Sequence, residues 1–210
     1  MKKNYTFNGY NNKVDLSDLD EEITFVEKGS PCGELLRRYW QPVILSEELG
    51  ELPKLVKILG EELVIFRDKS GQVGLLDKHC SHRGASLEYG IIADCGLICS
   101  YHGWHFDIDG SLLKAGSEPC KSPVHKRVKH GAYQTHEMEG IIFAYLGPPD
   151  KTPEFPLYDT QTNNDLKKVP FTIETPCNWL QVYENTQDPI HVIHLHARSS
   201  GVQFGVASGV

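Results

Sequence analysis

The sequence predicts a mostly β fold, with a small antiparallel β domain, a short helix before it and a more helical segment after it. Eight short β-prone runs separated by turn residues lie between Leu55 and Pro148, a spacing typical of small antiparallel β domains. Ser30 and Pro31 form a helix start, with serine as N-cap and proline at the first helical position. Beyond Pro148, a proline-rich connector ends the β pattern.

The first segment, residues 1–54, combines a polar lead-in with one helix. Residues 1–30 are punctuated by Asn and Asp, which predicts an extended chain. The run GELLRRYWQ, from Gly33 to Gln41, predicts a helix that ends at Pro42, because proline has no N–H to donate and clashes with the preceding turn.

The second segment, residues 55–150, is the predicted β domain. Its strands are LVKIL, ELVIFRD, VGLLD, GLICSYH, HFDID, SLLKA, AYQTHE and GIIFAYL. Glycines lie where hairpin turns should connect these strands, since glycine readily adopts the positive φ that tight turns require. These turn positions are Gly60, Gly71, Gly110 and Gly140.

The third segment, residues 151–210, opens with a connector that runs to Pro170. FTIE, at 171–174, predicts a short strand. NWLQVYENTQDPIHVIHLH predicts a helix that kinks or restarts at Pro189, with Asp188 as the N-cap of its second part.

Composition and charge exclude several functions. The net charge of −7 argues against nucleic-acid binding, because phosphate neutralisation requires a surplus of Lys and Arg. No apolar run approaches the roughly 20 residues of a membrane span, and the N-terminus lacks the apolar stretch of a signal peptide. We therefore expect a cytoplasmic protein whose six cysteines are metal ligands or core residues rather than disulfide partners.

Two short loops each offer one cysteine and one histidine, the ligand set of a Rieske-type [2Fe–2S] cluster. The four residues are Cys80, His82, Cys99 and His102. In such a cluster one iron binds both thiolates and the other binds both imidazoles. Gly84 and Gly103, shortly after each pair, would let the backbone turn closely around it. A structural zinc ion is the alternative, although zinc sites usually pair Cys with Cys in one loop and His with His in another.

The sequence resembles the N-terminal part of Rieske non-haem iron oxygenase α subunits, in the phthalate-dioxygenase and aryl O-demethylase branch. The motifs that carry the resemblance are CSHRGA, CSYHGW, GELLRRYWQPV, HRGASLEYG, HGWHFDIDG and GIIFAYLGPP. The resemblance implies a Rieske iron–sulfur domain followed by the truncated start of an α+β catalytic domain. It further implies an NAD(P)H-dependent reductase or ferredoxin as electron donor, O₂ and an aromatic acid as substrates, and a homotrimer at full length.

Differences from respiratory Rieske proteins predict a low reduction potential. Those proteins carry an extra cysteine in each motif, which together form a disulfide; this sequence has Ala85 and Tyr101 at these places. They also carry a serine that donates a hydrogen bond to the cluster, where this sequence has Trp104. Fewer donors stabilise the reduced cluster less, so we expect a potential on the order of −150 mV.

A second group of metal-ligating side chains lies within nine residues: Asp188, His191, His194 and His196. Asp188 and His191 would share one helix face. His196 would join them only if the helix bulges or ends there. Taken alone, this segment could equally be a polar helix face with its histidines in water.

The resemblance implies roles for this segment. His191 and His196 match ligands of a mononuclear Fe(II), whose third ligand is an Asp well downstream. Asp188 matches a residue that bridges the cluster histidine of a neighbouring subunit, which matches His102, to His191. Asn185 matches a residue with a supporting role near the iron. No Asp or Glu follows His196, so we expect a truncated chain without the third ligand.

Two functions remain open from the sequence. The first is an oxygenase component that hydroxylates or O-demethylates an aromatic acid with O₂ and reductase-supplied electrons. The second is a Rieske ferredoxin-like electron carrier without catalysis of its own, which the missing remainder of the catalytic domain favours.

Overall fold

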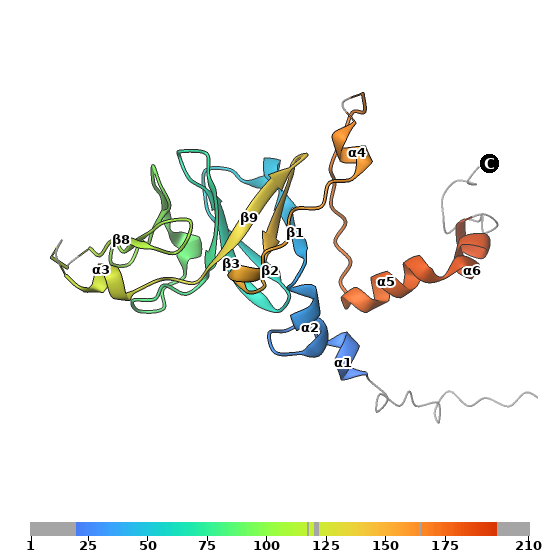
Figure 1. Ribbon diagram of the computed structural model, residues 1–210, viewed down its shortest axis with the longest axis horizontal. Coiled ribbons are helices and arrows are strands. Elements are labelled where there is room, and N and C mark those ends of the chain that lie inside the picture. The colour runs from blue at the N-terminus through green and yellow to red at the C-terminus, as the bar shows by residue number, and fades with distance from the viewer. Residues whose placement is uncertain (1–19, 117, 120–121, 164, 197–210) are drawn as a thin grey trace, which may run out of the picture. The chain divides into compact units, whose positions relative to one another are not determined.

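The computed structural model describes residues 20–116, 118–119, 122–163 and 165–196 (Figure 1). Its contacts divide the chain into two units. The first unit is residues 25–174, and the second combines the described residues 20–24 and 175–196. Every strand of the described chain lies in the first unit, and every neighbouring pair is antiparallel. The mostly β, antiparallel fold predicted from the sequence is confirmed.

The larger sheet has six strands in the order β1-β10-β9-β4-β3-β2. Their bounds are β1 Trp40–Leu45, β2 Lys54–Ile58, β3 Glu61–Arg67, β4 Val73–Asp77, β9 Ala132–Met138 and β10 Ile141–Tyr145. Two of its hairpins turn on Leu59-Gly60 and Glu139-Gly140, in which both residues have positive φ. This is the backbone of a type I′ turn, whose twist matches that of the flanking strands.

The smaller sheet has four short strands in the order β5-β6-β7-β8. They are β5 Ile91–Ile92, β6 Leu97–Ile98, β7 His105–Phe106 and β8 Leu112–Lys114. Figure 1 shows this sheet, with β8 and the helix α3 (Val124–Arg127), beside the larger sheet. Short helical turns η1 (Ser46–Glu48), η2 (Leu87–Tyr89) and η3 (Pro149–Lys151) and the helix α4 (Asp159–Thr162) complete the unit with α2 (Pro31–Leu36).

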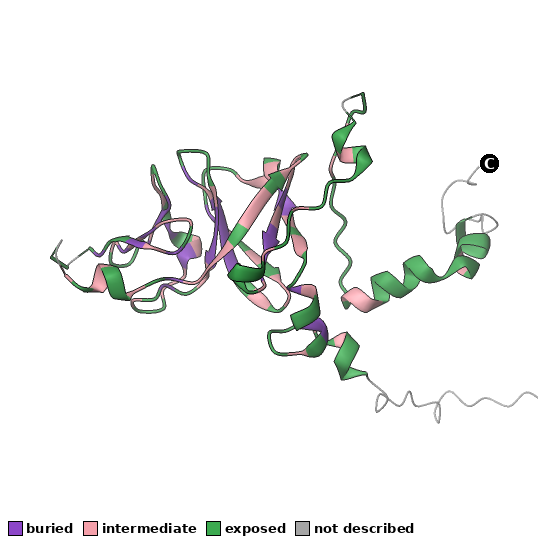
Figure 2. Ribbon diagram, viewed as in Figure 1, coloured by how far each residue is buried: buried purple, intermediate pink, exposed green. Residues whose placement is uncertain are grey.

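Strand β3 contributes to two apolar cores. Its residues Leu63 to Phe66 are all buried, and because side chains alternate along a strand they point to opposite faces of the sheet. Leu63 and Ile65 belong to a core with Ile142 and Ala144. Val64 and Phe66 join the other core, which contains Cys80, Leu87, Leu97, Cys99, Trp104 and Phe106. Figure 2 shows the buried residues concentrated in the strands.

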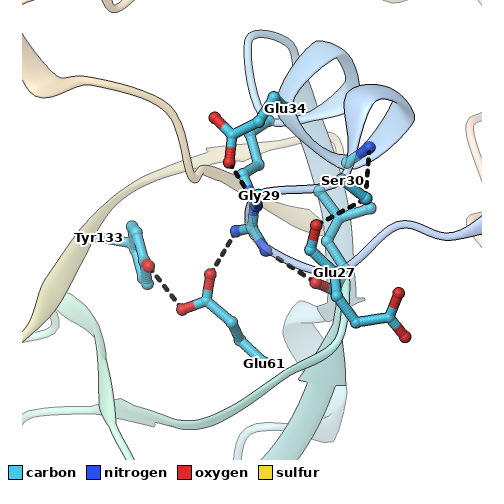
Figure 3. Close-up of polar contacts among 9 residues, drawn as sticks. Glu27, Gly29, Ser30, Glu34, Glu61 and Tyr133 are labelled. Atoms are coloured by element: carbon cyan, nitrogen blue, oxygen red, sulfur yellow. Dashed lines mark hydrogen bonds and ion pairs between the residues drawn. The ribbon is translucent and has the colours of Figure 1, made fainter. Parts of the chain in front are cut away.

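Helix α2 begins as predicted and is tied to the larger sheet. Ser30 is its N-cap, with Oγ accepting from Gly33 N at 3.2 Å (Figure 3). Arg37, buried at the end of the helix, donates to Glu61 and to the Leu59 carbonyl. The Tyr133 hydroxyl donates to the other Glu61 oxygen at 2.6 Å. Burial and the Glu61 carboxylate raise the pKa of Tyr133, so the phenol stays protonated.

Three details of the predicted elements differ from the structure. The helix expected over Gly33–Gln41 spans only Pro31–Leu36, and Trp40 already begins β1. Pro42 lies within this strand, which is tolerated because β1 is an edge strand and its register shifts between Pro42 and Ile44. All eight predicted runs contain strands, but β1 and β5 were not expected. The run at 171–174 forms no strand, because no described strand pairs with it.

The second unit is helical. It comprises α1 (Glu21–Thr24), α5 (Trp179–Gln187), α6 (Pro189–His191) and the π-helix η4 (Val192–His196). Asn178 caps α5 by accepting from Leu180 N at 2.9 Å and donates to the Thr24 carbonyl at 2.9 Å. The predicted break at Pro189 is confirmed, since α5 ends at Gln187 and Asp188 is the N-cap of α6.

Across the described residues, the structure has no helix of the length and apolar character that a membrane crossing requires.

Candidate metal centre

The two loops that carry the predicted cluster ligands lie against the smaller sheet. Box one, residues 80–85, follows β4 and precedes η2. Box two, residues 99–104, connects β6 to β7. An isolated bridge between His79 and Ser86 closes the base of box one, and the hydrogen-bonded pair of β6 and β7 closes the base of box two.

Both boxes have the same backbone hydrogen bonds, although their sequences differ. In box one, Cys80 N donates to the Ala85 carbonyl at 2.9 Å, and Gly84 N donates to the Cys80 carbonyl at 2.8 Å. In box two, Cys99 N donates to the Trp104 carbonyl at 2.7 Å, and Gly103 N donates to the Cys99 carbonyl at 3.0 Å. The two glycines share a positive φ, 69° and 68°. The structure therefore presents two equivalent loops, and the glycines turn as the sequence predicts.

The four candidate ligands divide into two pairs of like side chains. Cys80 and Cys99 are 3% and 2% exposed, belong to the same apolar core, and act on each other directly. His82 and His102 have ring centroids 4.7 Å apart, and His102 is exposed. Two thiols inside and two imidazoles toward the surface match a two-iron cluster, in which one iron binds sulfur ligands and the other binds nitrogen ligands.

Burial changes the protonation of these groups. Burial, together with the neighbouring Cys99, raises the pKa of Cys80 to about 11. Burial, followed by the nearby His102 and Arg83, lowers the pKa of His82, and the Nδ1 atom of His82 is buried without a hydrogen-bond partner. A neutral imidazole nitrogen without a hydrogen-bond partner can bind a metal ion. Bound iron would displace the thiol protons.

The pairing argues against a single zinc ion. The thiols and the imidazoles form two separate pairs of like side chains. A Cys₂His₂ zinc site requires all four ligands around one centre. Two irons require only two protein ligands each. The arrangement therefore fits the [2Fe–2S] cluster better than the zinc alternative.

Two residues other than the four candidate ligands lie against this centre. Trp104 is buried, and its ring stacks on His82 with centroids 4.6 Å apart and planes 3° apart. His130, from the segment before β9, hydrogen-bonds Ser81 within box one at 2.7 Å. The sequence motif of box two includes Trp104, directly after its His-Gly pair. No motif or spacing in the sequence pointed to His130.

The second group of predicted ligands lies in α6 and η4. Asp188 Oδ1 accepts from Ile190 N at 2.8 Å as the N-cap of α6, and its Oδ2 lies 3.6 Å from His191 Nδ1. The π-helix η4 supplies the bulge that the sequence required, so that the His191 and His196 ring centroids are 5.4 Å apart. Asn185 lies on α5, one turn before Asp188, and is exposed.

This second arrangement fits half of a mononuclear iron site. His191 and His196 could provide two neutral nitrogen ligands, with Asp188 beside the first. Glu184 on α5 joins no three-residue metal-ligand group of the described chain. The segment after residue 196, in which a third ligand was not expected, lies outside the described residues, as does Cys120.

The chain is similar to several known proteins. Residues 39–132 match the family model of the Rieske [2Fe–2S] domain. The chain is 49% identical over 191 residues to the tert-butanol monooxygenase / tert-amyl alcohol desaturase oxygenase subunit of Aquincola tertiaricarbonis, matching 90% of this chain and 41% of that protein. It is 44% identical over 202 residues to the phenoxybenzoate dioxygenase subunit alpha of Ectopseudomonas oleovorans, matching 88% of this chain and 49% of the relative.

Two further similarities extend this result. The phthalate 4,5-dioxygenase oxygenase subunit of Pseudomonas putida is 41% identical over 175 residues, matching 82% of this chain and 40% of the relative. The crystal structure of dicamba monooxygenase bound to dicamba superposes with a TM-score of 0.67 at 26% identity, covering 77% of this chain and 48% of that one. The chain thus spans less than half of the length of each of these proteins.

Proposed function

We propose that this chain forms the electron-receiving part of an oxygenase component. The proposal is supported by its match to the Rieske [2Fe–2S] domain and by its similarity to oxygenase subunits of the Rieske non-haem iron family. Residues 55–150 would be the cluster domain, preceded by the lead-in and helix of residues 1–54. Residues 151–210 would be the connector and the start of the catalytic domain. The cluster, when bound, supplies one-electron transfer.

We assign the cluster to Cys80 and Cys99 on one iron and to His82 and His102 on the other. The observation that carries this assignment is the segregation of the buried thiol pair from the imidazole pair. Trp104 orients His82 by stacking on it. The exposed His102 gives an electron the shortest route out of the domain, because the thiol end is enclosed by the core.

We assign the mononuclear Fe(II) to His191 and His196, with its remaining ligand from outside the described residues. This iron, when bound with open positions, supplies the site for O₂ chemistry. Asp188 accepts hydrogen bonds from backbone N–H groups at the start of α6 and places its carboxylate 3.6 Å from His191 Nδ1. In a homotrimer Asp188 would also face the cluster histidine of a neighbouring subunit, and Asn185 would support the same turn.

The proposed reaction is hydroxylation or O-demethylation of an aromatic acid, with electrons from an NAD(P)H-dependent reductase or a ferredoxin. The names of the phenoxybenzoate and phthalate oxygenase relatives support an aromatic acid. The name of the relative at 49% identity refers to tertiary alcohols, which makes them the competing substrate class. An oxygen-uptake assay of the longer protein with its reductase, comparing aromatic acids with tertiary alcohols, separates the two.

The cluster assignment is tested on this chain. The purified protein should contain about two irons and two acid-labile sulfides, and an NAD(P)H-driven reductase should bleach its visible absorption. The absence of the serine donor and of the disulfide places the expected midpoint on the order of −150 mV. One zinc and no sulfide would contradict the assignment, and a clearly positive midpoint would contradict the account of the hydrogen bonds.

The second candidate function is an electron carrier without catalysis. It is supported by the two cluster loops, which are complete among the described residues. Such a carrier would accept electrons from the reductase and pass them to an added acceptor such as cytochrome c. It would show no substrate-dependent oxygen uptake even in the longer protein, whereas the oxygenase would.

A further inference from the structure

His130 connects the end of a strand in the larger sheet to the middle of box one. Its Nδ1 lies 2.7 Å from Ser81 Oγ, and its Nε2 lies 2.9 Å from the carbonyl oxygen of Asp77, the last residue of β4. Ser81 stands between the candidate ligands Cys80 and His82. The histidine side chain therefore spans the gap between the sheet and the loop.

The His130 ring is held firmly in place. The residue is 3% exposed, and its ring stacks on Phe106 with centroids 4.6 Å apart. Its backbone N–H donates to the Gly110 carbonyl at 2.8 Å. A Cβ on Gly110 would lie 2.0 Å from the His130 carbonyl oxygen, so this approach requires glycine. Burial lowers the pKa of His130, which favours the neutral ring.

The two partners fix which nitrogen carries the proton. A carbonyl oxygen can only accept, so the contact with Asp77 requires the hydrogen on Nε2. The neutral ring then has no hydrogen on Nδ1, which must accept. The Ser81 hydroxyl is therefore the donor in the contact with His130. A hydroxyl has one hydrogen, and here that hydrogen points to His130 Nδ1.

We infer that His130 is a positioning residue that holds the Ser81 hydroxyl as a donor to imidazole and so keeps it from donating to the cluster. Hydrogen bonds to cluster sulfurs raise the reduction potential by stabilising the added electron. By accepting the hydrogen of Ser81, His130 keeps the potential low. This inference rests on the proposed cluster assignment, and it concerns the one-electron reduction of that cluster.

A matched pair of substitutions distinguishes the roles of the two ring nitrogens of His130. The amide of His130→Asn lies near the position of Nδ1 and can still accept from Ser81. The amide of His130→Gln lies near the position of Nε2 and keeps only the contact with Asp77. We expect the Gln variant to shift the reduction equilibrium about tenfold toward the reduced cluster, about 59 mV for one electron. The Asn variant should stay within twofold of the wild-type equilibrium.

Substitution of Ser81 tests the same idea without disturbing His130. Ser81→Ala should leave the potential unchanged, because the hydroxyl does not donate to the cluster in the native protein. The double variant His130→Gln, Ser81→Ala should return to the wild-type potential. His136→Gln, a partly buried histidine on β9 that packs on Phe155, is the matched control and should have no effect.

The measurement is a potentiometric titration of each purified variant, followed by visible absorption, after quantification of iron and sulfide. A lower potential in Ser81→Ala would overturn the inference, because Ser81 would then donate to the cluster. So would a raised potential that persists in the double variant, or an intact Gln variant with wild-type potential. If the Gln variant fails to hold the cluster, Ser81→Ala and His130→Asn still decide. A wild-type chain without iron and sulfide would instead contradict the proposed function.

Discussion

Cys80 and Cys99 place their thiols inside an apolar core, and burial raises the pKa of Cys80, so its unbound thiol stays protonated. Iron would replace those protons with bonds that the surrounding core protects from water. The two cysteines are thus the buried end of the proposed centre, and the two histidines are its accessible end. Loss of either thiol removes a ligand that no other described cysteine can replace, since Cys32 belongs to neither apolar core cluster and Cys95 and Cys177 are exposed.

Substitution of either cysteine should therefore abolish the cluster. Cys80→Ser and Cys99→Ser should each lose the visible absorption and nearly all acid-labile sulfide, because serine oxygen is a poor ligand for this cluster. Cys95→Ser changes an exposed cysteine in the turn before β6 and should retain both signals. Sulfide retained in Cys80→Ser would show that the thiol pair does not hold the cluster.

Asp188 combines a backbone role with a side-chain role, and a single substitution separates them. Asparagine caps helices about as well as aspartate, so Asp188→Asn should preserve α6. It removes the negative charge 3.6 Å from His191 Nδ1. In the longer protein that completes the iron site, we expect both metals to be retained and turnover to fall roughly 10- to 100-fold. Metal analysis and oxygen uptake measure this, and a wild-type rate with full metal content would refute the bridging role.

At the scale of elements, the two boxes are one loop design used twice. Each closes a hydrogen bond from its cysteine N–H to the residue five positions on, and each turns on a glycine with φ near 68°. The ligand spacing differs by one residue between the boxes, yet the backbone frame is the same. The extra residue of box two therefore lies within a frame that both loops share.

Gly84 and Gly96 have nearly the same φ, but we expect their substitution by alanine to lower the stability of the protein by different amounts. Gly84 has φ 69° and open space where a Cβ would lie. Gly84→Ala should therefore lower the free energy of unfolding by about 1–2 kcal/mol, the cost of the left-handed backbone for a residue with a Cβ. Gly96 has φ 68°, but its Cβ would lie 2.0 Å from the Phe106 carbonyl oxygen, so Gly96→Ala should cost clearly more. Urea unfolding of both variants measures the difference, and equal costs would contradict the role of the close approach.

At the scale of the whole molecule, Asp68 links the two sheets. It follows β3 of the larger sheet, and its Oδ2 accepts from Gly96 N, in the turn before β6 of the smaller sheet, at 3.1 Å. Its Oδ1 accepts from Gln72 N at 2.9 Å and from the Ser70 hydroxyl at 2.7 Å. Burial opposes ionisation, but these hydrogen bonds outweigh it and lower the pKa of Asp68 below 3.8.

This lowered pKa predicts how stability depends on pH. A carboxylate whose pKa is lower in the folded state stabilises the protein above its unfolded pKa of about 3.9 and loses that contribution as the pH falls through the folded value. Asp68→Asn should therefore be less stable than the wild type at pH 7, and the difference should shrink below about pH 4. Urea midpoints of both proteins across this range measure it. A difference that stays constant down to pH 2 would contradict the role of the charge.

The sequence by itself determined the features that depend on residue type and local spacing. The eight predicted runs, the hairpin glycines, the N-caps Ser30 and Asp188 and the break at Pro189 all follow from backbone rules that act over a few residues. The ligand types in the two boxes are likewise local. The predicted end of the first helix was wrong, because the pairing of β1 with β10 overrides the helical preference of Tyr39 to Gln41.

Only the tertiary structure decided which of these residues meet. The thiols pair with each other and the imidazoles with each other because the smaller sheet brings together loops that begin 19 residues apart, at Cys80 and Cys99. The π-helix η4, which a helical pattern does not reveal, turns His196 toward His191. His130 reaches Ser81 across 49 residues of sequence. Contacts of this kind depend on how the sheets pack, and no local pattern encodes them.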